Sequence, residues 1–577
     1  MMGEAAKKPK EVKYLPFNFT VTILATANLN GNIIDWDYSI PKTADIGMAK
    51  AFTVIKQERL ANSMNLLFDA GDSLYGSKLT DYYAFSNSNT SRIHPVVKAE
   101  NFMMYDAIVL GEKEFDYGQE TLINALSQSN AKLLAANVFD AKGKKQFPQA
   151  EPYMIKTFQI GDSKSKAKIN IGIIGVTTPA ILNLNNSQNY TDITIENQVS
   201  AVKESIKKLQ KKKVDAIIVV AHSGVDVDNS TVENQIVALA ENCPEINLII
   251  SGHKPGIIDE STPLYNSQRE QIYDKGVING VHILAPGQNG QYVGKASLLF
   301  EMFGRKYYIK NVNTTNISTA GITPDRDLLN IIWPYHDSTL QHLSAPIGNI
   351  NSEFTDADTQ MKNLGLVNFI NDIQLQASKA QLSAASSFGL NPEFDKNVIT
   401  NQDANSLYRF ESYLYSIEVT GEQLKQYLEH AAKYYKTFKE GDRIIRVGGD
   451  NDNILGFNYD VVKGINYTID ISKAPGERIK EITYNGTQVK DDDKFTLAIN
   501  SFRYNGSGGY ITAMGFNADN PPLILFDSQK AFGNFGQVKE LIASYIKSQD
   551  SISPTVPTNI IISTGPYTPV ETKFQNK

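Results

Sequence analysis

Five short apolar runs in the first half of the chain each lead into a cluster of polar residues. The runs and their clusters are 21–24 with 28–32, 65–70 with 71–72, 107–110 with 111–116, 216–221 with 222–224, and 248–251 with 252–253. Buried strands of α/β proteins present functional side chains at their carboxyl ends, where the loops form a crevice. The pattern therefore predicts an α/β domain whose functional site is assembled from several strand ends.

The hydrophobic pattern also predicts how the chain is divided. Apolar strands alternate with amphipathic helices over residues 13–322, which indicates a sheet covered by helices. Residues 323–344 have the spacing of one long helix, and residues 345–548 again mix strand and helix patterns. The last segment, 549–577, is rich in Pro, Thr and Ser, so we expect a flexible tail there.

Length and charge exclude several classes of protein. A chain of 577 residues is too long for one ordinary core, and its net charge of −6 argues against a nucleic-acid polymer as partner. No run approaches the roughly 18 apolar residues of a membrane span. Residues 1–20 contain lysines but no apolar segment, so as written they are not a signal peptide. We therefore expect a cytoplasmic protein or one that is released or associated with a surface.

The polar clusters carry a family resemblance. They read Asn28-Leu29-Asn30, Gly71-Asp72, Gly111-Glu112-Lys113-Glu114, His222-Ser223 and Gly252-His253-Lys254-Pro255. In order and spacing they resemble the calcineurin-like metallophosphoesterases, and more closely the 5'-nucleotidase family in its 2',3'-cyclic-nucleotide 2'-phosphodiesterase/3'-nucleotidase branch. That family reads D-x-H, G-D, G-N-H-E, H-S/T and G-H-x-H at these places, so the framework is similar while several functional residues differ.

The resemblance implies the architecture. Residues 13–322 should form the two-sheet α/β sandwich of a metallophosphoesterase, and 323–344 a linker helix. Residues 345–548 should form the α+β C-terminal domain of a 5'-nucleotidase, which binds the nucleotide. Members of the family are usually exported, although no signal peptide is evident in this sequence.

The resemblance also implies two metal sites, of which the first is altered. Its ligands would fall on Asn28, Asn30, Asp72 and Pro255. Of these only Asp72 is a good ligand, because two amides do not replace a carboxylate and an imidazole and proline offers no donor. We expect the first metal site to be lost.

The second implied site retains four possible ligands, namely Asp72, Glu112, His222 and His253. Two carboxylates and two imidazoles suit one zinc, manganese or iron ion. Alternatively, no metal binds, and Lys113 forms an internal ion pair with the neighbouring carboxylates that replaces the missing cation. A third possibility is that the histidines are held by hydrogen bonds of the core. The sequence leaves these alternatives open.

The family's proton donor is altered as well. Lys113 stands where the family has its catalytic histidine, and Asp116 is the acid that orients that residue. A lysine beside carboxylates should have a raised pKa, so it is a poor proton donor near neutral pH. We expect this pair to be inactive.

On the nucleotide side, the resemblance implies that Phe457 and Tyr510 stack on the base and that Asn458 hydrogen bonds to it. The alternative is that both rings belong to the core. The family's loop arginine is absent from 387–392, which weakens phosphate or ribose anchoring.

Three functions fit these residues. The first, which we favour, is a catalytically impaired homologue that serves in binding, structure or self-association. The second is a slow phosphoesterase or 2',3'-cyclic-nucleotide phosphodiesterase with one metal ion. The third is a protein that binds a nucleotide or nucleoside without cleaving it. Loss of a metal and of the proton donor should each remove several kcal/mol of transition-state stabilisation, which favours the first.

Overall fold

The structure is a computed structural model of the 577-residue chain. It describes residues 15–85, 92–161, 167–184, 192–304, 306–351, 364–386, 398–408, 412–450, 454–517, 520–555, 557–567 and 574–575. The chain divides into two compact units, Met1–Thr339 and Leu340–Lys577. The division falls inside helix α8 (Arg326–Ser344), where the sequence predicts a helix over 323–344.

The first sheet of the N-terminal unit carries three of the five strand ends. Its order is β20-β19-β1-β4-β5-β6-β8, and β1, β4, β5, β6 and β8 run parallel. The strands are β1 (Asn18–Thr26), β4 (Asn65–Asp69), β5 (Ala107–Ile108), β6 (Lys132–Leu134), β8 (Ala150–Glu151), β19 (Tyr292–Phe303) and β20 (Lys306–Ser318). Because β1, β4 and β5 are neighbours, their carboxyl ends meet at one edge.

The second sheet carries the other two strand ends. Its order is β14-β18-β13-β12-β10-β9, with β17 also paired to β18. The strands are β9 (Tyr153–Gln159), β10 (Lys168–Thr177), β12 (Ala216–His222), β13 (Leu248–Ser251), β14 (Ile257–Ile258), β17 (Val277–Ile278) and β18 (Val281–Pro286). Parallel pairing of β12 with β13 brings His222 and His253 to the same edge.

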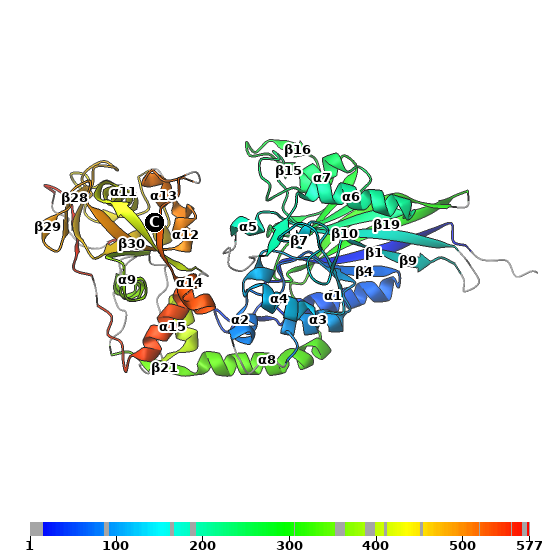
Figure 1. Ribbon diagram of the computed structural model, residues 1–577, viewed down its shortest axis with the longest axis horizontal. Helices are drawn as coiled ribbons and strands as arrows, with labels where there is room; N and C mark the ends of the chain where they lie inside the picture. The colour runs from blue at the N-terminus through cyan, green and yellow to red at the C-terminus, as the bar shows by residue number, and fades with distance from the viewer. Residues whose placement is uncertain are drawn as a thin grey trace, which may run out of the picture. The chain divides into compact units, whose positions relative to one another are not determined.

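The two sheets pack face to face, which confirms the predicted α/β sandwich. Their shared core joins Ile23 and Phe68 of the first sheet to Ile171, Ile218 and Ile250 of the second. Helices α6 (Gln198–Lys211) and α7 (Ile236–Asn242) cover one outer face, while α1 (Met48–Ala61), α3 (Pro95–Met103) and α4 (Gln119–Leu126) cover the other (Figure 1). No helix among the described ranges is both long and apolar enough to cross a membrane.

Local chemistry explains where α6 begins and which face it buries. The Asn197 side chain accepts a hydrogen bond from Ser200 N, which caps the amino end. Buried Val202, Ile206 and Leu209 recur at helical spacing and pack against the second sheet. In the sequence alone, the spacing of these apolar residues already predicts a helix within 195–213, and the structure has this helix.

The C-terminal unit is built on a five-stranded sheet in the order β26-β22-β30-β24-β31. The strands are β22 (Leu382–Ser386), β24 (Leu414–Thr420), β26 (Asp460–Lys463), β30 (Lys494–Asn500) and β31 (Ile524–Asp527), and the main helices are α9 (Leu364–Ser378), α11 (Gly421–Ala432) and α15 (Val538–Ser548). Thr420 and Gln423 form a capping box that starts α11. Strands and helices in one unit agree with the predicted α+β domain.

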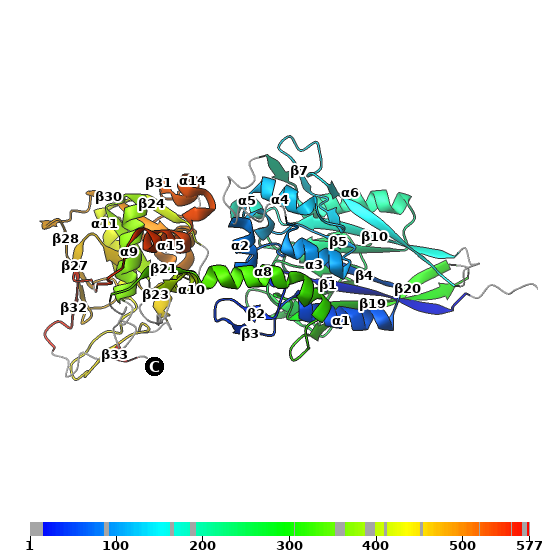
Figure 2. The ribbon, with the colours of Figure 1, turned by 90° about the horizontal axis from the view of Figure 1, so that it is seen from below.

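Part of the segment expected to be flexible is built into this unit. Strand β32 (Ile560–Ser563) pairs in parallel with β27 (Asn466–Asp470), which pairs on its other side with β28 (Ile479–Tyr484) (Figure 2). The run Ile560-Ile561-Ile562 has the β-branched side chains that favour a strand. Composition alone concealed it, since Pro and Thr dominate the flanking residues.

Candidate functional site

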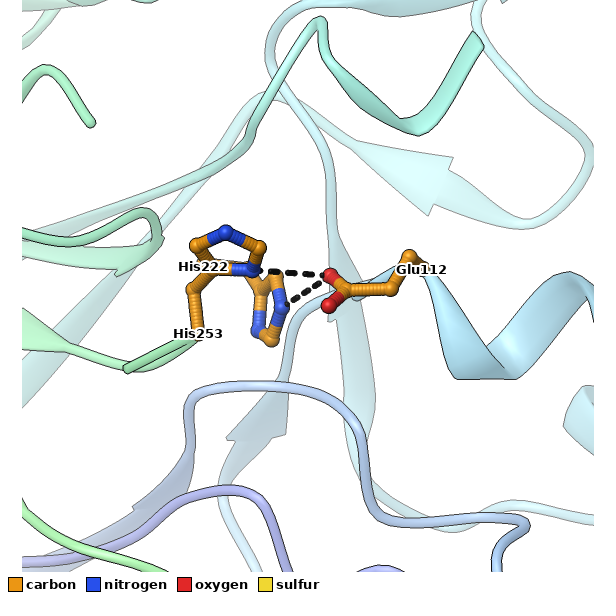
Figure 3. A group of neighbouring side chains, drawn as sticks. All are labelled: Glu112, His222 and His253. Carbon is orange, nitrogen blue, oxygen red and sulfur yellow. Dashed lines mark hydrogen bonds and ion pairs between the residues drawn. The ribbon is translucent and has the colours of Figure 1, made fainter. Parts of the chain in front are cut away.

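Three of the residues expected to bind a metal meet at the common edge of the two sheets. Donor atoms of Glu112, His222 and His253 all lie within 4.8 Å of one another (Figure 3). Glu112 Oε2 lies 2.7 Å from His222 Nε2 and 3.0 Å from His253 Nδ1. The fourth, Asp72, is adjacent, with Oδ1 3.6 Å from His222 Nε2.

His222 ends strand β12 and is fully buried. Its Nδ1 donates to the carbonyl of Ala70 at 2.7 Å, which directs Nε2 toward Glu112. Burial would lower the pKa of His222, but the carboxylates of Asp72 and Glu112 outweigh it and raise the pKa to about 10. The imidazole therefore carries a proton on both nitrogens in this arrangement.

His253 is held from three directions. Its backbone N donates to Asn28 Oδ1 at 2.9 Å, and Nδ1 faces Glu112. Its Nε2 lies 2.6 Å from Oε1 of Glu233, an acid that the sequence analysis did not single out. Lys254 Nζ contacts the same oxygen at 2.6 Å. Only the fold brings Glu233 here, because it belongs to a loop 20 residues before His253.

The arrangement fits one divalent ion. A histidine ligand usually donates its other ring nitrogen to a carbonyl or carboxylate, and His222 and His253 have such partners in Ala70 and Glu233. Tetrahedral bonds of about 2.0–2.1 Å require donor atoms about 3.3 Å apart, so the 2.7 and 3.0 Å contacts to Glu112 would open slightly. Asp72 could complete the set, and its burial raises its pKa to about 7.

The amide of Asn28, by contrast, is occupied by hydrogen bonds between loops. Its Nδ2 donates to the carbonyls of Lys254 at 3.2 Å and Gly287 at 2.9 Å, while its Oδ1 accepts from His253 N. Pro255, the remaining replaced ligand, is exposed. Asn28 thus joins the loops instead of facing an ion.

Asn30 is occupied in the same way. Its Nδ2 donates to the carbonyl of Asn28 and to Asn289 Oδ1, each at 2.8 Å. Its Oδ1 accepts from Lys113 Nζ at 2.9 Å. An ammonium group therefore contacts one of the positions where the family would place a ligand of the first metal.

Lys113 contacts both Asn30 and Asp72, and its expected ion pair with the neighbouring carboxylates stays a prediction. The Nζ atom bonds to the amide oxygen of Asn30, while the backbone N of Lys113 donates to Asp72 Oδ1 at 2.8 Å. The positive charge of Lys113 nevertheless acts on Asp72, since it contributes to lowering that carboxyl's pKa against the larger effect of burial. Asp116 directly follows the short 3-10 helix Lys113–Phe115.

Glu114 has a structural role that the sequence analysis missed. Its carboxylate accepts from the backbone N of Gly111 at 2.6 Å, Asp72 at 2.8 Å, Ser73 at 2.7 Å and Leu74 at 3.0 Å. Such a nest of amides holds the two loops together. The available signal was an acidic residue in the polar cluster 111–116 that follows an apolar run, and the structure shows that it is only 3% exposed.

Backbone conformation explains why asparagines suit this edge. Asn28, Asn30, Asp72 and His253 all have positive φ, at 49°, 51°, 58° and 70°. Asn and Asp tolerate this left-handed region better than most residues. The tight turns of the site are therefore kept although two of the expected ligands are replaced.

The expected base-stacking role of Tyr510 is not supported by its position. Tyr510 is 0% exposed, and its ring is surrounded by Tyr427, His430 and Arg503 at 4.4, 4.6 and 4.7 Å. Its hydroxyl donates to the carbonyl of Asn458 at 2.6 Å. Tyr510 therefore has no open face for a base in this conformation, and the alternative that the ring belongs to the core is the better description.

Phe457 and Asn458 are half-buried and are fixed by Arg503. The guanidinium donates to the carbonyl of Phe457 at 2.6 Å and to Asn458 Oδ1 at 3.1 Å. It also forms a buried, two-pronged ion pair with Asp460. The side-chain oxygen of Asn458, which was expected to hydrogen bond to the base, thus already accepts a hydrogen bond from Arg503. The loop 387–392, from which an arginine is absent, lies outside the described residues.

Comparison with known proteins agrees with this architecture. Residues 344–515 match the family model described as 5'-nucleotidase, C-terminal domain. Over 93% of its length the chain is 26% identical to the trifunctional nucleotide phosphoesterase protein YfkN of Bacillus subtilis, and it spans 38% of that protein. Over 91% of its length it is 26% identical to a Salmonella typhimurium 2',3'-cyclic-nucleotide 2'-phosphodiesterase/3'-nucleotidase and covers 86% of it.

Solved structures show the same fold. A proposed 5'-nucleotidase from Staphylococcus aureus superposes with a TM-score of 0.68 at 22% identity, covering 95% of this chain and all of that one. A 5'-nucleotidase precursor from Thermus thermophilus gives a TM-score of 0.53 at 19% identity, with 95% and 100% covered. At these identities the likeness concerns the fold alone.

Proposed function

We propose that this chain, a member of the 5'-nucleotidase family, is a catalytically impaired homologue that binds or assembles instead of rapidly cleaving phosphate esters. One observation carries the proposal. The side chains of Asn28 and Asn30 are occupied by hydrogen bonds, one of them from the ammonium of Lys113. A second divalent ion would have to break this network and accept amide ligands.

The chemical consequence is a loss of charge where phosphate is attacked. Two metal ions about 3.5–4 Å apart clamp the attacking and leaving oxygens in enzymes with such a centre. A single ammonium beside Asn30 supplies less charge than a second divalent ion, and Lys113 stands in place of the histidine expected to donate the proton. We therefore infer slow turnover or none.

The second candidate function is a slow phosphodiesterase with one metal ion. It is favoured by the orientation of His222 and His253, whose hydrogen bonds to Ala70 and Glu233 leave the other ring nitrogen of each facing Glu112, as in histidines that bind a metal. A divalent ion held there would polarise a phosphoryl oxygen or activate a water molecule. Asp72, Glu112, His222 and His253 would hold it.

One experiment separates the two candidates. Purified protein is loaded with Mn, Zn or Co, its metal content is measured, and it is given 2',3'-cyclic AMP and bis-p-nitrophenyl phosphate. Impaired function predicts at most one ion per chain and no turnover above that of Asp72→Ala. Turnover that disappears in Asp72→Ala supports the phosphodiesterase, and two bound ions per chain contradict both candidates.

Two further properties belong to the first candidate. Self-association should be visible as a defined oligomer in sedimentation at high concentration, and a strict monomer would count against an assembling role. Nucleotide binding would have to proceed without Tyr510, and Phe457 is the aromatic residue that remains partly exposed. Titration with adenosine tests it, and a binding heat that Phe457→Ala abolishes is the supporting result.

A further inference from the structure

A small basic cavity lies in the N-terminal unit, apart from the residues of the strand-end site. Its volume is 280 Å³, and its lining consists of Arg92, Ile93, Lys98, Pro334 and Tyr335. Lys98 belongs to α3, and Arg92 and Ile93 directly precede that helix, while Pro334 and Tyr335 belong to α8. None of these residues has a role in the function proposed above.

Tyr335 forms a fixed aromatic surface in this cavity. The residue is 7% exposed, and its hydroxyl donates to the carbonyl of Ile93 at 2.8 Å. Because this bond and the helix fix both ends of the side chain, the ring cannot swing away. Ile93, which is 43% exposed, and Pro334 add apolar surface beside it.

Two cations meet at this ring. The Arg92 guanidinium carbon lies 5.9 Å and Lys98 Nζ lies 5.3 Å from the ring centroid. No carboxylate lines the cavity, and neither cation has an ion pair with a carboxylate among the described ranges. The site is therefore locally positive in a chain whose net charge is −6.

The ring alone does not balance these charges. A cation–π contact at an exposed site contributes about 0.5–1 kcal/mol, and two like charges near one ring also repel each other. An anion between them would remove that repulsion and gain charge-assisted hydrogen bonds from both groups. The apolar lining favours a ligand whose anionic group is attached to a flat apolar body.

We propose that this cavity binds a small molecule in which a phosphate or carboxylate group is attached to a planar ring. Its volume of 280 Å³ lies just below the roughly 300–1,000 Å³ range of drug-sized ligand sites, so the ligand is about the size of one ring with its oxyanion. Arg92 and Lys98 contact the oxyanion, and Tyr335, Ile93 and Pro334 contact the ring.

The neighbouring Trp333 provides the readout. It is 54% exposed, it precedes Pro334, and the chain has only one other tryptophan, Trp36. Phenyl phosphate, benzoate and neutral benzyl alcohol are titrated separately into the full chain while tryptophan fluorescence and thermal melting are followed. We expect one or both anions to bind with an affinity that falls at higher ionic strength, and benzyl alcohol not to bind.

Charge variants test the assignment. Arg92→Gln/Lys98→Gln should weaken binding of the anion at least tenfold, whereas Lys207→Gln/Lys211→Gln, which removes two exposed charges from α6, should not change it. The relative affinities of phenyl phosphate and benzoate identify which oxyanion is preferred. Absence of binding by both anions up to about 10 mM would overturn the proposal. So would equal binding of benzyl alcohol, or an unchanged affinity in a folded Arg92→Gln/Lys98→Gln variant.

Discussion

The buried pair of Asp460 and Arg503 allows the sharpest test of how the C-terminal unit is held together. Asp460 is 2% exposed and Arg503 3%. Arg503 Nε donates to Asp460 Oδ2 at 3.0 Å, and Nη2 donates to Oδ1 at 2.8 Å. Tyr427 adds a hydroxyl hydrogen bond to Oδ2 at 2.5 Å. We predict that Asp460→Asn destabilises this unit strongly although it preserves the side chain's shape.

The size of the destabilisation follows from the charge of Arg503, which remains buried when Asp460 is replaced. Burial alone would lower the pKa of Arg503, but Asp460 holds it above its ordinary value, so the guanidinium stays charged. Removal of one partner from a buried ion pair costs about 3–5 kcal/mol, because the other charge remains without its counterion. The carbonyl of Phe457 and Asn458 Oδ1 still accept from Arg503, so we expect the lower end, about 3 kcal/mol.

Urea unfolding of the full chain measures this loss. Both tryptophans lie in the N-terminal unit, so their fluorescence serves as an internal control while circular dichroism follows both units. Asp460→Asn should shift only the unfolding transition of the C-terminal unit, which is seen by circular dichroism and not by tryptophan fluorescence. An exposed carboxylate provides the matched variant, since Asp491→Asn should change stability by less than about 0.5 kcal/mol.

The single variants Asp460→Asn and Arg503→Met and the double variant Asp460→Asn/Arg503→Met together form a double-mutant cycle. If the buried charge causes the loss, the double variant should be more stable than the sum of the single changes predicts, by about 2 kcal/mol. A loss below about 1 kcal/mol in Asp460→Asn, or simple additivity in the cycle, would refute the reasoning.

Three further predictions concern the N-terminal unit. Glu233→Gln should lower zinc affinity about 10- to 100-fold, because the amide no longer holds His253 through a charge-assisted bond. Competition with a chelating dye measures the affinity. The control Lys254→Met leaves the contact between Glu233 and His253 in place and should have little effect. Zinc binding should release at least one proton, because the pKa of His222 is raised to about 10 and the ligand must be neutral; calorimetry in two buffers of different ionisation enthalpy gives the number, and zero would contradict the assignment of His222. Stability should fall in acid, because burial lowers the pKa of His94 to about 3. Below pH 6.5 the unfolded chain therefore binds a proton that the folded chain does not bind. The loss of stability is absent above pH 6.5 and should reach about 3 kcal/mol at pH 4, as measured by tryptophan-monitored unfolding. His94→Phe should reduce that acid loss, and an identical pH profile in the variant would be inconsistent with it.

Much of the fold could be predicted from residue patterns alone. Apolar runs before Asp72, Glu112, His222 and His253 indicated buried strands that end at a common edge, and the structure has strands there. The helix within 195–213 followed from its apolar spacing and is present as α6. These features depend on contacts close in sequence, which periodicity reports directly.

The partners within the site could not be read in the same way. Asn28 joins Lys254 and Gly287, which are 226 and 259 residues away, and Glu233 reaches His253 from a separate loop. Tyr510 was a plausible stacking ring until packing placed it against Tyr427. The spacing of residues along the chain does not predict these long-range contacts, because they depend on how strands and loops pack together.

The sequence by itself thus determined where the apolar strands end, the positions of the replaced ligands and the identity of the side chains available for chemistry. Only the tertiary structure decided which amides are occupied, where the ammonium of Lys113 bonds, and that β32 belongs to a sheet. The physical reason is that covalent order fixes which donors and acceptors exist. Packing of distant segments fixes which of them are satisfied, and a satisfied amide is no longer available to a metal ion.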